Sequence, residues 1–468
     1  MRALGRALPL VVVLALATAC NGWLSFRGDP GLSGFNPNES VLTPANIASL
    51  QEVFATAPAT GGLEGGPVVA NGVVYVTSTA GELLAYDARG SANCSGSPVR
   101  CVPLWRAGLP AYSAAAPTIS GDLVYVVSGS TDAPGTLQAF RAGTGASCAL
   151  DGSGPTRTCA PVWQANVTSP FAAPTVADGV LYTIDLSTGS TRLVAFDAAG
   201  VNGCGGQPVV CSPLWATADG STHVAPAVAN GLVYQPQTSG VVHAYDARGE
   251  RGCSGSPKTC APLWSTTPPP PMDNEPFAAP VVGGFLVMRA SRSLQVFDAL
   301  GSTGCAGTPV VCQPLWSATV GQQGLLVFDA VAHGNVYVMA DSQIAVYDLA
   351  GVNGCGGSPR TCSPLRFIRW GTRPPGNIGG NDAVARSSSL TIAGDVGLVG
   401  LGGQGSTDWR LVAFDATSTT ACTGVPLTCP ILWARSLGTW VDSTPAVLDG
   451  RVYVGTRDGV LHVFAPSG

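Results

Sequence analysis

A short phrase, repeated along the chain, constrains the fold more than any other sequence feature. In its clearest copies, residues 173–182 and 225–234, it runs from Ala-Pro through Val-Ala and a turn pair (Asp-Gly or Asn-Gly) to Tyr. Copies, two of them degenerate, begin near Pro67, Pro117, Pro174, Pro226, Pro280, Asp329, Leu390 and Pro445. Self-similarity at a spacing of roughly 50 residues marks a repeat architecture, so the chain is one unit copied along its length.

Each copy predicts four short β-strands. The phrase supplies the first two, joined by Asn-Gly, Asp-Gly or Gly-Asp, which accept the positive φ of a tight hairpin turn. The third strand ends in an aromatic residue followed by an aspartate, at Asp87, Asp197, Asp246, Asp298, Asp348 and Asp415. The fourth carries a tryptophan, at Trp105, Trp163, Trp215, Trp264, Trp316 and Trp433, with Arg366 in its place in the sixth copy. A repeated four-stranded antiparallel unit of this kind is the blade of a β-propeller.

The last copy predicts how the ring closes. It begins at Pro445, ends at Phe464 and lacks a fourth strand, whereas residues 50–56 read as a lone strand before the first copy. Pairing these segments covers edges that otherwise invite aggregation. The predicted fold class is therefore all-β: an eight-bladed β-propeller of four-stranded antiparallel blades, closed by an N-terminal strand that completes the last blade. An open solenoid is the rival architecture.

The domain organisation follows from these copies. We assign residues 1–20 to a signal peptide, residues 21–46 to an N-terminal lead-in and residues 47–468 to a single propeller. Hydrophobic residues make up 46% of the chain, which excludes a disordered protein.

Fourteen of the 15 cysteines form close pairs in the sequence. We predict seven disulfides: Cys94 with Cys101, Cys148 with Cys159, Cys204 with Cys211, Cys253 with Cys260, Cys305 with Cys312, Cys355 with Cys362, and Cys422 with Cys429. The alternative is metal binding, but two cysteines with no second pair or histidine nearby do not make a zinc site. Seven disulfides indicate an oxidising compartment.

The unpaired cysteine, Cys20, follows a secretory signal. Arg2 and Arg6 form its basic start, an apolar stretch follows, and small residues precede Cys20. This end resembles a bacterial lipobox, which implies lipidation of Cys20, although Ala17 stands where that motif prefers leucine. The alternative is an ordinary signal peptide cut nearby. We expect an exported protein, a cell-surface or periplasmic lipoprotein or else a secreted one, that meets the membrane only through its anchor.

Two further motifs carry a family resemblance. Residues 23–37 resemble the lead-in of secreted bacterial members, and Ala-Tyr-Asp-Ala at residues 85–88 and Val-Phe-Asp-Ala at residues 296–299 resemble the family's third-strand signature. The chain thus resembles the PQQ-like (quinoprotein-type) β-propeller repeat proteins. The resemblance implies the propeller fold, but one fold hosts many functions.

The resemblance also raises the possibility of an enzyme. Quinoprotein alcohol dehydrogenases pair adjacent cysteines near the cofactor and hold calcium with carboxylates and an asparagine, but this chain has no Cys-Cys dipeptide. Its recurring aspartates suit a turn role, and its four histidines lack metal-type spacing. We therefore expect no catalytic residue, metal ligand or cofactor. A PQQ- and calcium-dependent oxidoreductase, or another enzyme that uses the channel mouth, is the alternative.

Propeller geometry predicts where a binding site lies. The connections from each fourth strand to the next first strand gather on one face around the central channel, and loops on a rigid scaffold commonly carry function. The candidate binding face comprises Glu64, Phe171, His223, Phe277, Trp370, Arg373, Asp382, Arg386 and Asp442. The net charge of −5 gives no basic footprint for nucleic acid. We predict a monomeric, non-enzymatic binding or scaffold protein whose partner is a protein, a polysaccharide or a small molecule.

Overall fold

The computed structural model describes most of the chain. The described residues are 22–130, 133–152, 154–169, 171–186, 191–218, 220–268, 279–290, 292–320, 329–340, 343–369, 388–401, 409–441 and 443–467. The predicted signal peptide and Cys20 lie outside these residues. No helix among the described residues is long and apolar enough to cross a membrane.

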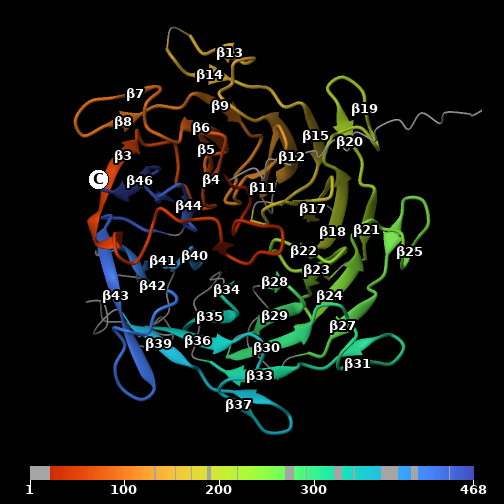
Figure 1. Cartoon of the computed structure of the whole chain (residues 1–468). Helices are drawn as coiled ribbons and strands as arrows, with labels where there is room; N and C mark the ends of the chain where they lie inside the picture. Colours follow the sequence, from red (N-terminus) through yellow and green to blue (C-terminus); the bar gives the residue numbers. More distant parts are fainter. Residues whose placement is uncertain are drawn as a thin grey trace, which may run out of the picture.

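The described strands pair into eight four-stranded antiparallel units arranged around a central axis, here called blades 1 to 8 in chain order (Figure 1). In each blade the first strand is innermost and the fourth is outermost. The first strands are β4 (Val68–Ala70), β10 (Thr118–Ser120), β16 (Thr175–Ala177), β22 (Ala227–Ala229), β28 (Val281–Val282), β34 (Ala330–Ala332), β40 (Thr391–Ala393) and β44 (Ala446–Leu448). The prediction of an all-β propeller is confirmed.

The remaining blade strands follow the same order. The second strands are β5 (Val73–Ser78), β11 (Leu123–Ser130), β17 (Val180–Asp185), β23 (Leu232–Pro236), β29 (Phe285–Ala290), β35 (Asn335–Ala340), β41 (Val396–Leu401) and β45 (Arg451–Gly455). The third strands are β6 (Glu82–Asp87), β12 (Ala133–Arg141), β18 (Arg192–Asp197), β24 (Val242–Asp246), β30 (Ser293–Asp298), β36 (Gln343–Asp348), β42 (Arg410–Asp415) and β46 (Leu461–Pro466). The outer strands are β9 (Trp105–Gly108), β15 (Trp163–Asn166), β21 (Trp215–Thr217), β27 (Trp264–Thr266), β33 (Trp316–Thr319), β39 (Arg366–Arg369), β43 (Leu427–Ser436) and β3 (Leu50–Thr56).

The two ends of the chain meet in blade 8. Strand β3 pairs antiparallel with β46, from Leu50 opposite Pro466 to Ala55 opposite His462. The lone N-terminal strand therefore supplies the missing fourth strand of the last copy, as predicted. A short 3-10 helix, η1 (Ile47–Ser49), precedes it.

Tyrosine and tryptophan side chains tie each blade to the next. In blade 2, the hydroxyl of Tyr125 and the indole N–H of Trp163 both donate to the carbonyl of Ala198 in blade 3, at 3.0 and 3.2 Å. Where the sixth copy lacks the tryptophan, the guanidinium of Arg366 donates instead to carbonyls that include Thr417 O at 3.0 Å in blade 7. The repeated aromatic residues therefore pack blade against blade, and the indoles of Trp105, Trp163 and Trp316 also donate to carbonyls of the next blade.

The aspartate after each third strand fixes the following turn. Asp348 accepts backbone N–H bonds from Ala350, Val352 and Asn353, and the other five aspartates accept comparable bonds. Burial acts to raise the pKa of Asp348, but these hydrogen bonds outweigh it and hold that pKa below its usual value. The recurring aspartates thus have the structural role that the sequence indicated.

The cysteine segments form hairpins that project from the rim of the ring (Figure 1). All seven predicted disulfides are present. Six segments form two-stranded hairpins, β7 (Cys94–Ser95) with β8 (Arg100–Cys101), β13 (Ala149–Leu150) with β14 (Arg157–Thr158), β19 (Cys204–Gly205) with β20 (Val210–Cys211), β25 (Cys253–Ser254) with β26 (Thr259–Cys260), β31 (Cys305–Ala306) with β32 (Val311–Cys312), and β37 (Cys355–Gly356) with β38 (Thr361–Cys362). In the seventh, the second half is continuous with β43.

Each of these hairpins adds to the blade before its own. Strand β20, from blade 3, pairs parallel with β15 of blade 2, and the same relation holds for the other hairpins. We call these seven segments the caps. The sequence predicted the cysteine pairs, but it did not predict that these segments extend outward and cover the edge of the neighbouring blade.

The lead-in lies in the central channel. Strand β1 (Gly22–Trp23) pairs with β4, and β2 (Phe35–Asn36) pairs with β40. Between them, carbonyls of the lead-in accept N–H bonds from first strands of blades 2, 4, 5 and 6. The red N-terminal segment crosses the middle of the ring in Figure 1. These contacts lie near the ends of the first strands, beside the turns that join the first strand of a blade to the second. We call this face of the ring the bottom face. The opposite face is the top face.

Candidate functional site

The top face carries the predicted binding residues that the structure describes. Glu64, Phe171 and His223 lie in connections that lead into blades 1, 3 and 4. Of the other candidates, Phe277, Trp370, Arg373, Asp382, Arg386 and Asp442 lie outside the described residues. Glu64 and Phe171 belong to one series of side-chain contacts on this face. The exposed His223 is not part of this series.

The centre of this series is an arginine held between an aromatic ring and a carboxylate. The guanidinium carbon of Arg457, in the turn between β45 and β46, lies 4.0 Å from the ring centroid of Trp440. Its Nε lies 3.3 Å from a carboxylate oxygen of Glu64. Because the two side chains are 32% and 26% exposed, solvent screens this ion pair, and we assign it a positioning role rather than a large stabilising energy.

Aromatic rings extend the contacts on both sides. Toward blade 7, Trp440 packs against the buried Trp409 with ring centroids 4.7 Å apart. Toward blade 2, Tyr112 lies beside Glu64 and meets Phe171 edge to face, with centroids 6.0 Å apart. Phe171 is 50% exposed. We call these six residues the top-face arc: Trp409, Trp440, Arg457, Glu64, Tyr112 and Phe171.

The hydroxyl of Tyr112 keeps its proton at neutral pH. Partial burial raises the pKa of Tyr112, and the nearby carboxylate of Glu64 raises it further, whereas Arg457 lowers it. The Tyr112 hydroxyl therefore remains protonated, and it is a hydrogen-bond donor toward the carboxylate. The arc thus presents a fixed guanidinium, a carboxylate and a hydroxyl between aromatic rings.

Glu64 and Phe171 were candidates from the sequence, whereas the other four residues of the arc were not among those candidates. Tyr112 and Trp440 both stand five positions before the proline of the following repeat, so an aromatic residue at that position was a usable signal. Arg457 lies in a turn between a second and a third strand. Turns between second and third strands lie on the same face as the connections between blades. The predicted binding face included residues of the connections alone.

The lead-in also meets a buried ionic cluster that serves the fold. The guanidinium of Arg289 binds the carboxylate of Asp329 at 3.1 Å, and Arg27 of the lead-in donates to the backbone carbonyl of Asp329. All three side chains are at most 3% exposed. Asp329 stands where most copies have proline, so this substitution provides a charged attachment point for the lead-in.

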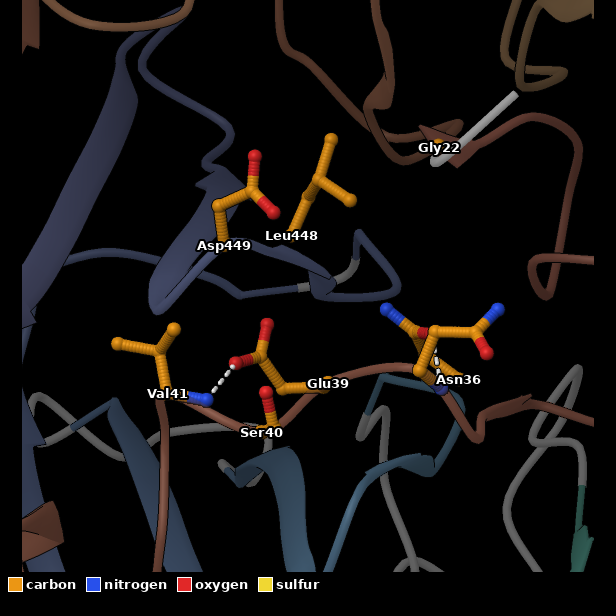
Figure 2. A pocket seen from close by; sticks show the side chains of 8 residues that line it. Gly22, Asn36, Glu39, Ser40, Val41, Leu448 and Asp449 are labelled. Carbon is orange, nitrogen blue, oxygen red and sulfur yellow. Dashed lines mark hydrogen bonds between the residues drawn. The ribbon is translucent and has the colours of Figure 1, made fainter. Parts of the chain in front are cut away.

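A small polar pocket lies on the bottom face between the lead-in and blade 8 (Figure 2). Its most buried carboxylate, Glu39, accepts N–H bonds from Val41 at 2.8 Å, Leu42 at 2.9 Å and Gly450 at 3.1 Å. Through these hydrogen bonds, the Glu39 carboxylate joins the lead-in to the turn before β45. We therefore interpret the pocket as part of the attachment of the lead-in.

The described residues offer few side chains that could bind a metal ion. They contain no group of three or more His, Cys, Asp or Glu side chains placed to hold a metal ion. Their cysteines are all paired in the rim caps, away from the channel.

Comparisons with known proteins support the fold. A family model described as outer membrane protein assembly factor BamB, of a PQQ repeat family, matches residues 46–148. No curated protein matches the sequence significantly. Solved structures resemble the fold at low sequence identity.

BamB from Moraxella catarrhalis is 14% identical, with a TM-score of 0.56 over 89% of this chain and 98% of its own. A quinohemoprotein alcohol dehydrogenase from Comamonas testosteroni is 12% identical, with a TM-score of 0.62 over 96% of this chain and 81% of its own. A europium-containing methanol dehydrogenase is 13% identical, with a TM-score of 0.59 over 95% of this chain and 98% of its own. At these identities the likeness establishes the fold, and the two kinds of neighbour leave the function open.

Proposed function

Because the chain folds as a β-propeller and residues 46–148 match the family model described as outer membrane protein assembly factor BamB, we propose that it is a non-enzymatic binding or scaffold protein that docks a protein partner on its top-face arc. The observation that carries this proposal is the arc itself. The seven disulfides indicate a protein outside the cytoplasm, and the proposed partner is therefore an extracytoplasmic one.

The chemistry of the arc favours a protein as its ligand. Tryptophan, tyrosine and arginine dominate the residues that contribute most to protein–protein binding. Arg457 is already positioned by Trp440 and Glu64, so little side-chain freedom is lost when a partner binds. The ring of Trp440 is already contacted by Arg457 and by Trp409. These contacts disfavour a sugar ring stacked on Trp440.

The proposed lipid anchor would orient this face. The described chain begins at Gly22, which pairs with Ala70 near the first hairpin turn of blade 1, on the bottom face. Cys20 is two residues earlier, so a lipid on Cys20 would hold the bottom face toward the membrane. The arc would then face away from the membrane and remain accessible to a partner.

The experiment compares partner binding by the wild-type protein and an arc variant. Purified tagged protein is incubated with envelope extract of the producing cells, the retained protein is identified and purified, and its affinity is measured directly. We expect Phe171→Ala with Arg457→Ala to weaken that affinity at least tenfold. Val201→Ala, at an exposed rim residue, is the matched control and should bind normally. Equal affinities of the wild type and the arc variant would contradict the proposal.

A second measurement addresses the enzymatic alternative. PQQ and calcium are added to the purified protein, and absorbance and reduction of a redox dye in the presence of alcohols are followed. The proposal predicts no stoichiometric quinone uptake and no dye reduction. Clear uptake with turnover would replace it with an oxidoreductase.

A further inference from the structure

Blade 7 differs from the other blades at its outer edge. The outer strands of the other seven blades each pair in parallel with a cap. In β43, Leu427–Pro430 serves as the cap of blade 6, and the segment that follows pairs with β42 on its inner side. Among the described strands, none pairs with the outer side of Trp433–Ser436. We call this segment the open edge.

The open edge is exposed where its counterparts are buried. Trp433 is only half-buried, whereas the tryptophans of the capped blades, Trp105, Trp163, Trp215, Trp264 and Trp316, are at most 4% exposed. Ala434, Arg435 and Ser436 are exposed. Ile47 of η1 and Phe464 pack near Trp433, but they cover it with side chains rather than with a paired strand.

The capped blades show which backbone bonds the open edge leaves unused. In blades 2, 4 and 5 the residue after the tryptophan donates its N–H to a cap carbonyl, as Gln164 does to Val209 at 3.0 Å. Ala434 occupies this position in blade 7, and no described residue accepts from its N–H. An unpaired strand edge of this kind is a template for another strand.

Arg435 indicates which strand fits. In capped blades the position two after the tryptophan lies opposite the second cysteine of the cap and holds a small or apolar residue, as Thr217 does opposite Cys260. Blade 7 has Arg435 there, and the described residues form no ion pair with it. A second copy of the chain would bring like charges together if the two edges paired, whereas an acidic side chain on a different protein would complement the arginine.

We propose that the open edge binds an extended segment of a partner protein by strand addition, parallel to β43, with an acidic residue beside Arg435. Main-chain hydrogen bonds to Ala434 and contact with Trp433 supply affinity, and the charge at Arg435 supplies selectivity. This surface lies on the rim of blade 7. It is therefore separate from the top-face arc and does not depend on the proposed function.

The test uses the protein's own cap as a probe. A disulfide-closed peptide copying residues 202–213 is made in two versions, Val209→Glu and Val209→Lys. In the register of the cap on blade 2, Cys211 occupies the place opposite Arg435, and position 209, two residues earlier, lies diagonal to Arg435 within reach of a long charged side chain. Binding to the full chain is measured by fluorescence anisotropy, and amide hydrogen exchange is measured over residues 432–437. We expect the Glu version to bind about two- to five-fold more tightly than the Lys version. We also expect it to slow exchange at Ala434.

Two variants of the chain complete the test. Arg435→Glu should reverse the preference between the peptides. Ala434→Pro removes the outward N–H without touching the bonds to β42, and should abolish binding while melting within a few degrees of the wild type. Equal binding of both peptides, or binding without protection of residues 432–437, would overturn the proposal. Self-association of the chain that Ala434→Pro removes would also overturn it, because the occupant would then be a second copy.

Discussion

At the scale of single residues, one position in each repeat links neighbouring blades. The indole of Trp163 donates to a carbonyl of blade 3 and is almost fully buried. Trp433 is the matched exception, because blade 8 has no loop between its third and fourth strands to supply a carbonyl. It packs edge to face with Phe464 instead, with centroids 5.7 Å apart. The same residue type at the same repeat position therefore contributes differently in the two blades.

We predict that Trp163→Ala destabilises the protein by about 3–5 kcal/mol, because it leaves a large cavity and removes one of the two hydrogen bonds to the Ala198 carbonyl. Trp433→Ala should cost clearly less, since its side chain is already half exposed. Urea unfolding followed by circular dichroism measures both. If the two variants lower the free energy of unfolding equally, the contact of Trp163 with the next blade does not contribute to stability.

The turn aspartates predict how stability depends on pH. The pKa values of Asp87, Asp197, Asp246, Asp298 and Asp348 are held below normal in the folded state, against the opposing effect of burial. Such groups stabilise the fold above their unfolded pKa of about 3.9, and this stabilisation is lost as pH falls through the folded pKa. We expect a nearly constant melting temperature down to about pH 5 and a steep fall below about pH 4. Asp348→Asn should make that fall shallower, and an unchanged profile would count against the assignment.

At the scale of elements, the caps transfer stability between blades. The Cys204–Cys211 hairpin belongs to blade 3 in the sequence, yet its strand β20 covers the edge of blade 2. Seven such caps interlock the blades in one direction around the rim. Each disulfide therefore closes a short loop in its own blade and also stabilises the strand that covers the outer edge of the preceding blade.

We predict that Cys204→Ser with Cys211→Ser lowers stability by roughly 2–3 kcal/mol, the loop-closure contribution of a bridge of this size. The more specific result is its location. Amide exchange should accelerate at Gln164 in blade 2, whose N–H binds the cap, and not at the equivalent Ser265 in blade 4, whose own cap is intact. Exchange that changes only within blade 3 would contradict the cap arrangement.

Most of the elements were predictable because their signals are local. Residues 50–56 and the cysteine pairs were identified from patterning alone and are found as predicted. What the sequence did not predict depends on contacts between distant parts. The caps add to a neighbouring blade, the lead-in runs through the channel, and Arg457 meets Glu64 across nearly the whole length of the chain. No periodicity within one repeat encodes such contacts.

At the scale of the whole molecule, the functional proposal depends on closure of the ring. The arc joins Trp440 and Arg457, near the end of the chain, to Glu64 and Tyr112, near its beginning. These residues are brought together because β3 completes the blade that contains β46. The lead-in reinforces the ring from inside by bonding to first strands of most blades. The arc is thus a product of the joined ends, and it would not exist in an open array of the same repeats.

The most direct test of this account is native-state amide hydrogen exchange of the two terminal strands. If the ends pair, the amides of Leu50–Thr56 and Leu461–Pro466 exchange slowly and at a common rate, comparable with that of a central blade such as blade 4. Rapid exchange of residues 50–56 while residues 461–466 stay protected would mean that the ring is not closed by the N-terminal strand, and it would remove the structural basis of the arc.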